Sequence, residues 1–310
     1  MTSQPASVPP AETSAASPGT APGSVSRSLR LNCGYGTDRG LHRETNEDSF
    51  IAADPVFAVA DGMGGHEAGE VASGVCVRTL SEIPELAAGK RDATAALIQK
   101  YLLLADTRIR EATGSRAGTT LSGVVVVEQQ GIRYWLVFNV GDSRTYLLNQ
   151  GKLSQVTVDH SEVQELVDAG EITSAEAAFY PRRNVVTRAL GTGDETEADY
   201  WLLPVGEGDR ILVCSDGLNG ELDDEHIARI LLSEKDPQLA VNELIQAALR
   251  SGGRDNVTCV VLDASSVAND DSVRAVPGSA VQAESEGTLT RTEVLDVVPD
   301  GQIAGAESER

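Results

Sequence analysis

Three apolar segments of this sequence run directly into an aspartate that stands next to a glycine, and this recurrence constrains the fold more than any other feature. The segments read VFAVADG (56–62), WLVFNVGD (135–142) and RILVCSDG (210–217). A further acid, Asp255, stands in the reverse order, just before the apolar segment 257–262. Short apolar segments rich in β-branched residues are typical of buried strands. Each aspartate is therefore expected where a strand leaves the core, held on rigid backbone.

Short turns between the expected strands predict antiparallel pairing. The segments EQQGIR (128–133) and LNQG (148–151) have the composition of hairpin turns. A parallel crossover needs a dozen or more residues, so strands joined by such turns pair antiparallel. The expected strands include 49–53, 56–60, 121–128, 133–140, 144–148, 210–214 and 257–262.

Four segments carry helical signals. Residues 92–112 place apolar side chains at helical spacing behind Asp92, which we expect to be the N-cap. Residues 236–251 begin with Asp236 as N-cap and Pro237 at the first helical position. The other two segments are 67–81 and 223–233. Hairpins combined with separate long helices predict an α+β fold of packed antiparallel sheets covered by helices.

The two ends of the chain differ in composition from its middle. Residues 1–27 consist mostly of Ala, Pro, Ser, Thr and Gly, and residues 266–310 are acidic and rich in small side chains. Such segments bury too little apolar surface to offset the entropy lost on ordering, so we expect both to be mainly disordered. One domain is predicted, at 28–265.

Charge and cysteine content exclude several classes of protein. The 310 residues include 47 acidic and 25 basic side chains, which gives a net charge of −22. Nucleic-acid binders concentrate positive charge against phosphates, so no nucleic-acid partner is expected. The four cysteines include no C-x-x-C pair, which indicates a reduced, cytoplasmic protein. No signal-peptide pattern and no apolar stretch of about 18 residues are present, so we expect no membrane partner.

The glycine-rich segment after Asp61 does not fit the known phosphate-binding loops. A dinucleotide fingerprint that starts at Gly62 needs glycine where the chain has Glu67, and a P-loop that starts at Gly64 needs lysine where it has Glu70. An Asp-Gly pair alone is ordinary turn chemistry, and this interpretation stays open for each site taken singly. Several acids gathered at strand ends repel one another unless cations compensate them, and Mg²⁺ and Mn²⁺ prefer oxygen ligands. Taken together, the acids predict a divalent-cation site made of oxygen ligands.

Seven short motifs occur in order along the predicted domain. They are Arg43-x-x-Asn46-Glu47-Asp48, Asp61-Gly62-Met63-Gly64-Gly65-His66, Ala117-Gly118-Thr119-Thr120, Gly141-Asp142-Ser143-Arg144, Asp159-His160-Ser161, Ser215-Asp216-Gly217-Leu218 and Arg254-Asp255-Asn256-Val257-Thr258. One tetrapeptide alone is weak evidence, but the ordered series spans about 30–263. The series resembles the metal-dependent protein phosphatases of type 2C (the PPM family) in their bacterial form.

This resemblance implies a fold, an activity and partners. The fold is a four-layer α-β-β-α sandwich, with two antiparallel sheets flanked by helix pairs and a two-metal centre at one end. The activity is that of a signalling serine/threonine protein phosphatase, in which a bridging metal-bound hydroxide attacks phosphoserine or phosphothreonine directly. The cofactors are two Mn²⁺ or Mg²⁺ ions, with a third, weaker ion in bacterial members. The partners are phosphorylated proteins, among them Ser/Thr kinases and their substrates.

The resemblance also assigns the central catalytic and metal-binding residues. Asp61 bridges both metals, and the Gly62 carbonyl binds one of them. Asp216 and Asp255 hold the other metal.

Further residues surround this centre in the same family pattern. Glu47 and Asp48 act on the first metal, chiefly through its waters. Asp142, together with Asp216, supports the third metal. Arg43 binds the substrate phosphate, whose oxygens suit a guanidinium fork.

The proton donor is the point at which this sequence departs from many eukaryotic members. Those members have histidine in the position of Met63, and methionine cannot donate a proton. His66 is a candidate general acid, with a structural role as the alternative, and His160 is a second candidate. Another acid or a metal-bound water are the remaining choices.

Residues 159–190 resemble the mobile flap beside the catalytic cleft of bacterial members. Arg182 and Arg183 form a basic patch there, which is either a solvated charge pair or an attractor of acidic phosphoproteins. Two other functions stay open: a non-catalytic regulator with the same fold, and a hydrolase of small phosphate esters. The three intact metal acids favour an enzyme over the regulator, and the long flap argues against a small substrate.

Overall fold

A computed structural model describes residues 29–64, 68–177, 179–193 and 197–265. The expectations for 1–27 and 266–310 lie outside the described residues, and the boundaries of the predicted domain, 28–265, stay a prediction. In the described part of the chain, no helix combines the length and apolar character that a membrane crossing requires.

The described residues form runs of strands separated by runs of helices along the chain. The strands are β1 (Arg30–Asp38), β2 (Asp48–Ala53), β3 (Val56–Gly64), β4 (Ala117–Thr119), β5 (Leu121–Gln129), β6 (Ile132–Val140), β7 (Arg144–Asn149), β8 (Lys152–Gln155), β9 (Asp199–Pro204), β10 (Arg210–Cys214) and β11 (Val257–Ser265). The helices are α1 (Ala68–Ser81), α2 (Ala95–Thr113), α3 (Glu162–Asp168), α4 (Ser174–Ala177), α5 (Asp216–Asn219), α6 (Asp224–Ser233) and α7 (Pro237–Ser251), with a 3₁₀ turn at Pro84–Leu86.

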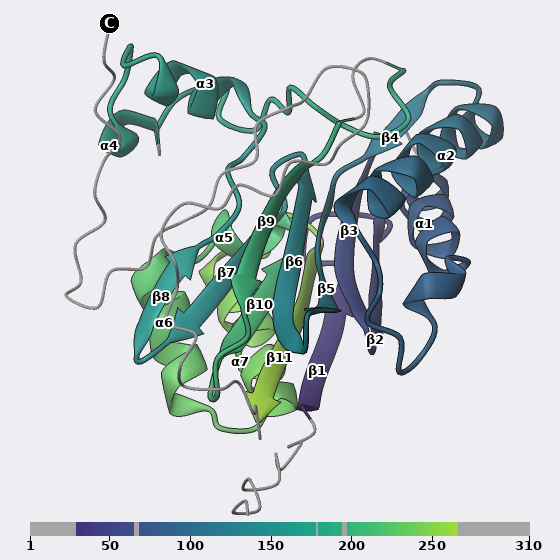
Figure 1. Cartoon of the computed structure of the whole chain (residues 1–310). Coiled ribbons are helices and arrows are strands. Elements are labelled where there is room, and N and C mark those ends of the chain that lie inside the picture. The colour runs from purple at the N-terminus through teal and green to yellow at the C-terminus, as the bar shows by residue number, and fades with distance from the viewer. Residues whose placement is uncertain (1–28, 65–67, 178, 194–196, 266–310) are drawn as a thin grey trace, which may run out of the picture.

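Two antiparallel sheets form the centre of the molecule (Figure 1). One sheet has the strand order β1-β11-β10-β7-β8, and the other has the order β2-β3-β5-β6-β9, with the short β4 paired to β3. The hairpin β5–β6 pairs Leu121 with Val140 at its open end and Gln129 with Ile132 at its turn. Strand β1 pairs with β11 along its whole length, so the beginning and the end of the described chain lie side by side.

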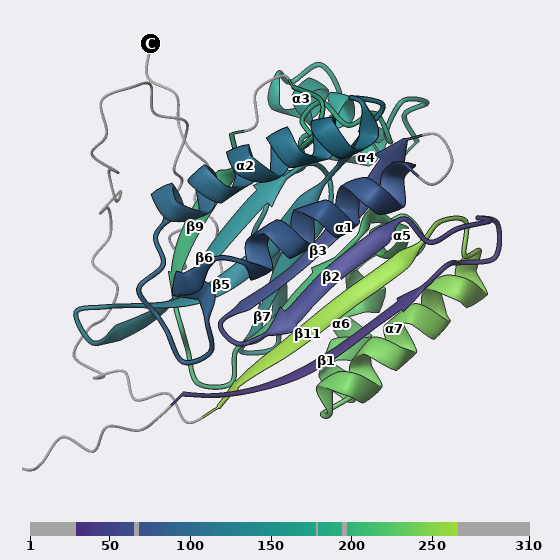
Figure 2. The same cartoon turned by 90° about the vertical axis from the view of Figure 1, so that its right-hand side faces the viewer.

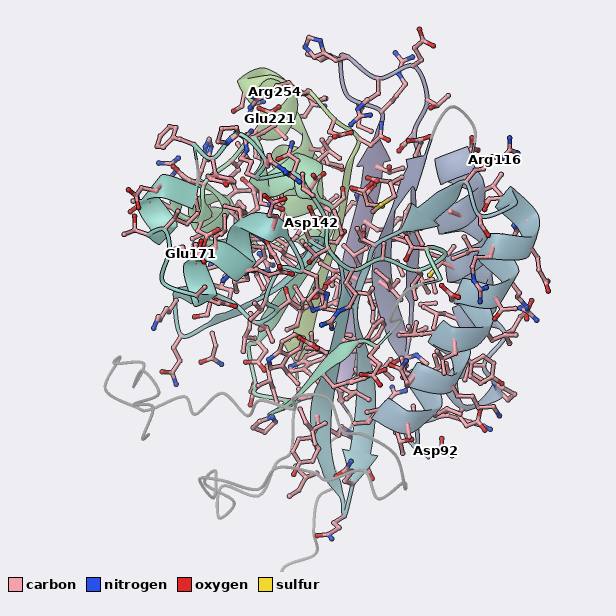
Figure 3. The ribbon with its side chains drawn as sticks, turned by 90° about the horizontal axis from the view of Figure 1, so that it is seen from above. Asp92, Arg116, Asp142, Glu171, Glu221 and Arg254 are labelled. Carbon is pink, nitrogen blue, oxygen red and sulfur yellow. The ribbon has the colours of Figure 1, made fainter. Side chains whose placement is uncertain are left out.

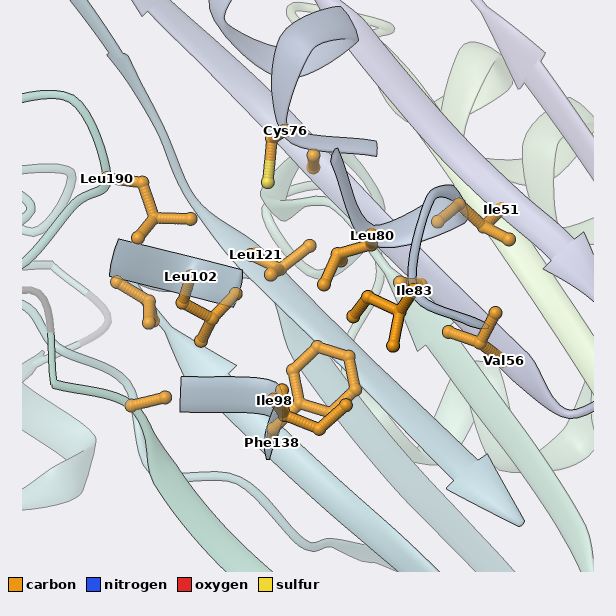
Figure 4. Close-up of a cluster of buried hydrophobic side chains, with 14 of the residues drawn as sticks. Ile51, Val56, Cys76, Leu80, Ile83, Ile98, Leu102, Leu121, Phe138 and Leu190 are labelled. Carbon is orange, nitrogen blue, oxygen red and sulfur yellow. The ribbon is translucent and has the colours of Figure 1, made fainter. Parts of the chain in front are cut away.

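Helices cover the outer faces of both sheets (Figure 2). Helices α1 and α2 pack on the sheet that contains β3 and β5, where Leu80, Ile98 and Leu102 meet Leu121 and Phe138 (Figure 4). Helices α5, α6 and α7 pack on the sheet that contains β10 and β11. Fully burying one such aliphatic or aromatic side chain stabilises a fold by about 1.5–3 kcal/mol.

A third apolar layer lies between the two sheets. Phe57 and Trp135 from one sheet meet Val213 and Val260 from the other. Successive side chains of a strand point to opposite faces. The continuous apolar run 124–127 of β5 therefore supplies the layer between the sheets and the layer under α1 and α2 at once. The predicted four-layer α-β-β-α sandwich is confirmed.

Both predicted hairpin turns are present. Gln130 (φ 53°) and Gly131 (φ 81°) connect β5 to β6, and Gln150 (φ 49°) and Gly151 (φ 82°) connect β7 to β8. Two successive residues with positive φ match the right-handed twist of the flanking strands. The sequence therefore placed these turns correctly.

The N-cap predicted for α2 is wrong. Asp92 is exposed, and the helix begins two residues later, where the hydroxyl of Thr94 accepts a hydrogen bond from the Leu97 N–H at 3.2 Å. The preceding segment is held extended, because the Arg91 carbonyl accepts from the Glu128 N–H at 2.7 Å. This backbone hydrogen bond at Arg91 thus keeps the residues before Thr94 out of the helix.

Strand β1 went unpredicted because its sequence, RLNCGYGTD, is a weak strand pattern. Its conformation depends on its partners. A Cβ on Gly34 would lie 2.4 Å from the backbone N of Gln238, so α7 packs directly on the strand. The amide of Gln238 bonds both the N–H and the carbonyl of Tyr35.

Candidate metal centre

Every predicted metal acid in the described residues lies at one end of the sandwich. Asp48 begins β2 and is paired in register with Asp61 of β3. Asp142 lies in the turn between β6 and β7, Asp216 begins α5 directly after β10, and Asp255 lies just before β11. Figure 3 views the molecule from above and labels Asp142 near the middle of the picture. The strand ends therefore bring together acids that are up to about two hundred positions apart in the sequence.

The backbone of Asp61 is held by a pair of threonines. Its carbonyl accepts hydrogen bonds from the Thr120 N–H and the Thr119 hydroxyl, both at 2.9 Å, and its N–H donates to the Thr120 hydroxyl at 3.2 Å. The Thr120 hydroxyl is also 2.7 Å from that of Ser143. These contacts fix the strand from which the Asp61 carboxyl projects.

The carboxyl of Asp48 has one satisfied oxygen and one unsatisfied oxygen. Its Oδ2 accepts from the Ser215 hydroxyl at 2.8 Å, while its buried Oδ1 has no hydrogen-bond partner among the described residues. Burial raises the pKa of Asp48 to about 7, opposed by hydrogen bonds from Thr258 and Ser215. A buried, unpaired carboxylate oxygen is costly unless a cation or proton meets it.

Asp216, like Asp48, has one buried carboxyl oxygen without a hydrogen-bond partner in the described part of the chain. Ser215 is the N-cap of α5, and the buried Oδ1 of Asp216 has no hydrogen-bond partner among the described residues. Burial raises the pKa of Asp216 to about 6, with a further increase from the charge of Asp255. A hydrogen bond with the Asp61 carboxyl opposes this shift.

Asp255 is the acid with the most compensation from within the chain. Its Oδ1 accepts from the Asn256 N–H at 2.8 Å, and its Oδ2 accepts from Nη2 of Arg43 at 2.5 Å. Arg43 is half exposed, so its guanidinium can also reach a ligand in solvent. The hydrogen bond to Asp255 raises the pKa of Arg43, and desolvation opposes this shift. The negative charges of Asp255, Asp61 and Asp216 raise the pKa further.

The pKa values of the remaining acids are also raised by burial and by neighbouring negative charge. Burial, followed by the charges of Asp48, Asp216 and Asp142, raises the pKa of Asp61 well above its ordinary value. Burial and the charge of Asp216 raise the pKa of Asp142 to about 8. Positive charge placed among these groups would restore their ionised forms.

The donor set fits hard divalent cations. It consists of carboxylates, the ligands that Mg²⁺ and Mn²⁺ prefer, and one buried oxygen each of Asp48 and Asp216 has no hydrogen-bond partner among the described residues. In the part of the chain that the structure describes, no group of three or more His, Cys, Asp or Glu side chains is arranged so that it could hold a metal ion. The case for cations therefore rests on the electrostatics of the acids and on their unpaired oxygens.

The glycines that follow two of the acids allow close backbone contact. A Cβ on Gly62 would lie 2.2 Å from the carbonyl oxygen of Gly69, and a Cβ on Gly217 would lie 1.9 Å from that of Asn256. Any larger residue would push these segments apart. Each glycine thus lets a neighbouring segment pack against the acid that precedes it.

Glu47 lies against the first turn of α1. A Cβ on Gly69 would meet its carboxyl carbon at 2.7 Å, and its backbone carbonyl accepts from the Gly62 N–H at 3.2 Å and from the Ser73 hydroxyl at 2.6 Å. Burial raises the pKa of Glu47, and the charge of Arg43 opposes this. Glu47 is therefore at the edge of the acid group, next to Asp48.

His160 is part of the structure that supports Asp142. Its Nδ1 accepts from the Gly141 N–H at 3.0 Å, and its Nε2 lies 3.2 Å from Oδ2 of Asp199. The Nδ1 contact requires the proton to be on Nε2, where Asp199 accepts it. Both ring nitrogens are thus used internally, which disfavours the role of general acid. His66, the other candidate, lies outside the described residues, so its role stays a prediction.

The predicted flap, residues 159–190, contains α3 and α4 among its described residues. Arg182 forms an ion pair with Glu162 at 2.7 Å, which supports the interpretation as a solvated charge pair. The flap returns to the sandwich where Leu190 and Thr119 exchange backbone hydrogen bonds at 2.9 Å. Thr119 therefore connects the end of the flap to the backbone of Asp61.

Sequence reasoning missed the hydroxyl groups that hold the acids. Ser215 bonds Asp48 and also accepts from the Thr258 N–H at 3.0 Å, and Thr120 holds Asp61. Each of these residues lies inside a quoted motif, beside an acid. Nothing in the linear pattern shows which acid a hydroxyl meets, because Ser215 bonds an acid 167 positions away.

Comparison with known proteins identifies the family. The sequence profile described as "Protein phosphatase 2C" matches residues 38–250. The serine/threonine protein phosphatase PstP of Mycobacterium tuberculosis is 39% identical over 283 residues, which is 85% of this chain but 53% of PstP, so the chain spans about half the length of that relative. The serine/threonine phosphatase stp of Listeria monocytogenes is 35% identical over 248 residues, which cover 75% of this chain and 96% of stp.

Solved structures agree with the sequence relatives. The catalytic domain of PstP in complex with two manganese ions matches with a TM-score of 0.68 at 38% identity, covering 77% of this chain and all of that domain. The Mycobacterium smegmatis phosphatase MsPP, solved with cacodylate, matches with a TM-score of 0.67 at 40% identity, covering 75% of this chain and 97% of that one. The chain therefore belongs to the protein phosphatase 2C family of bacterial serine/threonine phosphatases.

Proposed function

We propose that this chain is a metal-dependent protein phosphatase that hydrolyses phosphoserine and phosphothreonine by direct attack of water on phosphorus. The observation that carries the proposal is the group of buried acids at one end of the sandwich, whose pKa values are raised by burial and by one another. Such acids need cations, and the solved PstP catalytic domain holds two manganese ions. We propose two Mn²⁺ or Mg²⁺ ions here, and a third beside Asp142.

Each acid has a role in this proposal. When bound, the two cations supply the positive charge that activates water and neutralises the phosphoryl oxygens. Asp61 would help to hold both cations, and the Gly62 carbonyl would help to hold one of them. Asp216 and Asp255 hold the second position. These three aspartates are the acids that we propose as essential for catalysis.

The surrounding residues hold the cations or bind the substrate phosphate in this proposal. Asp48 is held by the Ser215 hydroxyl and serves the first cation position, with Glu47 acting through water. Asp142 and Asp216 supply the third position. The exposed fork of Arg43 binds two phosphate oxygens, for which a planar guanidinium is well suited. We propose phosphorylated proteins as substrates, including Ser/Thr kinases and their targets.

Phosphate hydrolysis with and without metal tests the proposal. We expect hydrolysis of an aryl phosphate and of a phosphothreonine peptide in Mn²⁺, and none in EDTA. Asp216→Asn should lower the rate by about 10²-fold or more, because it removes charge stabilisation at the reacting centre. Asp92→Asn is the matched control, since it makes the same change in charge at an exposed residue far from the acids (Figure 3).

The outcomes separate the alternatives. Activity that survives EDTA, or an Asp216→Asn variant as active as Asp92→Asn, would contradict the two-cation mechanism. No hydrolysis of either substrate by a protein that binds Mn²⁺ would favour the non-catalytic regulator. Hydrolysis of the aryl phosphate alone would favour a small-molecule substrate.

A further inference from the structure

Glu221 and Arg254 form a clasp outside the acid group (Figure 3). Oε1 of Glu221 accepts from the backbone N–H of Arg254 at 3.0 Å and from its Nε at 2.8 Å. Oε2 of Glu221 accepts from Nη2 of Arg254 at 2.9 Å. Nη2 also donates to the Gly220 carbonyl at 3.3 Å. One carboxylate thus bonds both the side chain and the backbone of the residue next to Asp255.

The two halves of the clasp differ in exposure. The side chain of Glu221 is 3% exposed, whereas that of Arg254 is 62% exposed. The Glu221 carboxylate is enclosed by the turn it binds, since a Cβ on Gly252 would lie 2.8 Å from its Oε2. The hydrogen bond from Arg254 holds the pKa of Glu221 below its usual range. A bidentate pair with one buried partner is held more firmly than an exposed ion pair.

The clasp joins the two segments that carry Asp216 and Asp255. Glu221 follows α5, whose first residue is Asp216, and the Gly220 N–H donates to the Asp216 carbonyl at 2.7 Å. Arg254 directly precedes Asp255. The same two segments touch again where a Cβ on Gly217 would lie 1.9 Å from the Asn256 carbonyl oxygen. The distance between the two acids therefore depends on how these segments are tied together.

The loop that carries Glu47 is tied to the other side of the same turn. The Asn256 side chain accepts from the Glu47 N–H at 2.8 Å and donates to the carbonyls of Arg39 and Thr45. Asn256 thus ties the turn that carries Asp255 to the loop that carries Glu47, while the clasp ties it to the segment that carries Asp216. The two connections are separate, and of these two the clasp is the one that joins the segments of the acids proposed to share one cation.

We propose that Glu221 and Arg254 are positioning residues that preset the separation of Asp216 and Asp255 and so determine the affinity for the cation those acids share. This inference rests on the proposed function, because it takes Asp216 and Asp255 as ligands of one cation. Among the described residues, the hydrogen bonds of the clasp side chains go to each other, to the Arg254 N–H and to the Gly220 carbonyl, not to the carboxyls of the acid group. Partners that orient metal ligands typically change metal affinity by about 10–100-fold when they are removed.

The test compares two substitutions of opposite charge, Glu221→Gln and Arg254→Gln. A purely electrostatic role would move Mn²⁺ affinity in opposite directions, since the first variant removes a negative charge near the acids and the second removes a positive one. A positioning role weakens Mn²⁺ binding in both. We expect each variant to weaken Mn²⁺ binding by about 10-fold or more in titration calorimetry. The double variant should be no weaker than the single ones, because both break the same connection.

Kinetics provide the second readout. The Mn²⁺ concentration for half-maximal phosphatase activity should rise in step with the calorimetric constant, while the rate at saturating Mn²⁺ changes little. A loss of general stability would instead lower the melting temperature in EDTA and the saturated rate together. Arg254→Gln tests the proposal even if Glu221→Gln fails to fold, because the Arg254 side chain is mostly exposed.

An ion pair on α7 supplies the matched control. Nη2 of Arg250 lies 2.6 Å from Oε1 of Glu243, and both side chains are exposed. Glu243→Gln and Arg250→Gln repeat the same charge changes and should leave Mn²⁺ affinity as in the unaltered protein. Clasp variants that match these controls, or that shift in opposite directions, would overturn the positioning role. Absence of Mn²⁺ binding by the unaltered protein would instead overturn the proposed function, and the clasp's role with it.

Discussion

At the scale of single residues, the site is a set of acids that the fold holds in an unfavourable state. Asp48 and Asp61 face each other across neighbouring strands, and each has its pKa raised first by burial. Each also has a specific backbone or hydroxyl contact that prevents it from turning away. Such strain is typical of a functional site, since a merely structural aspartate would be paired or exposed.

His160 provides a prediction at this scale. Glutamine cannot reach both the Gly141 N–H and Asp199 as the imidazole does, so His160→Gln should leave a buried donor unsatisfied. We expect the free energy of unfolding to fall by about 1–3 kcal/mol in denaturant titrations. The activity should decrease without any change in the shape of its pH profile, because neither ring nitrogen is free to donate to a leaving group.

The opposite outcome for His160→Gln would assign His160 a role in proton transfer. If His160→Gln kept its stability but lost one limb of the pH–rate profile, His160 would be the general acid after all. Thr157→Val can serve as a comparison, since Thr157 is also buried in this region but its side chain accepts, among the described residues, only from the Thr145 N–H. That variant should lose stability without any effect on the pH profile.

At the scale of elements, the buried strands supply a rigid backbone, and the acids lie at or beside the ends of these strands. Strand β10 is buried along its whole length, and α5 begins at Asp216 immediately after it. The strand cannot shift without exposing apolar surface, so the acid at its end has a fixed place. Helices α1 and α7 keep the sheets in place from outside.

The start of α2 gives a prediction for an element. Thr94→Ala should reduce the free energy of unfolding by about 1 kcal/mol, because it removes the hydroxyl that accepts from the Leu97 N–H. Asp92→Ala, the same truncation at the residue that sequence alone selects, should have little effect on thermal unfolding. A larger loss in Asp92→Ala than in Thr94→Ala would place the cap at Asp92.

At the scale of the whole molecule, the acid group opposes folding unless cations are bound. The folded pKa values of Asp48 (about 7) and Asp142 (about 8) exceed the unfolded value of about 3.9. Between these values the folded protein binds more protons than the unfolded chain, so its free energy of unfolding decreases as pH rises. The overall net charge of −22 adds repulsion in the same direction.

Thermal unfolding in EDTA checks this expectation. The melting temperature should fall as the pH rises from about 5 to about 8, since the raised pKa values are titrated in that window. Mn²⁺ should restore stability, and its effect should be larger at the higher pH, where the carboxylates are ionised. Asp142→Asn should make the decline in EDTA shallower. A melting temperature that is flat or rises over this range would contradict the raised pKa values.

Local signals in the sequence were sufficient for most of the architecture and for the identity of the acids. Apolar runs define strands, helical spacing defines helices, and both follow from backbone geometry within a few neighbouring residues. Hence the β5–β6 and β7–β8 hairpins, the N-cap Asp236 and the acids at strand ends were predictable. The ordered motifs added the family, and with it the four layers.

Tertiary structure alone decided which residues meet. The β2–β3 register places Asp48 opposite Asp61, Ser215 reaches an acid from another sheet, and Glu221 closes on Arg254 across 33 positions. Pairing with β11 also makes β1 a strand, and the N-cap of α2 is Thr94 rather than the predicted Asp92. These outcomes depend on contacts between segments far apart in the chain, whose free energy outweighs local preference and leaves no signal in either segment alone.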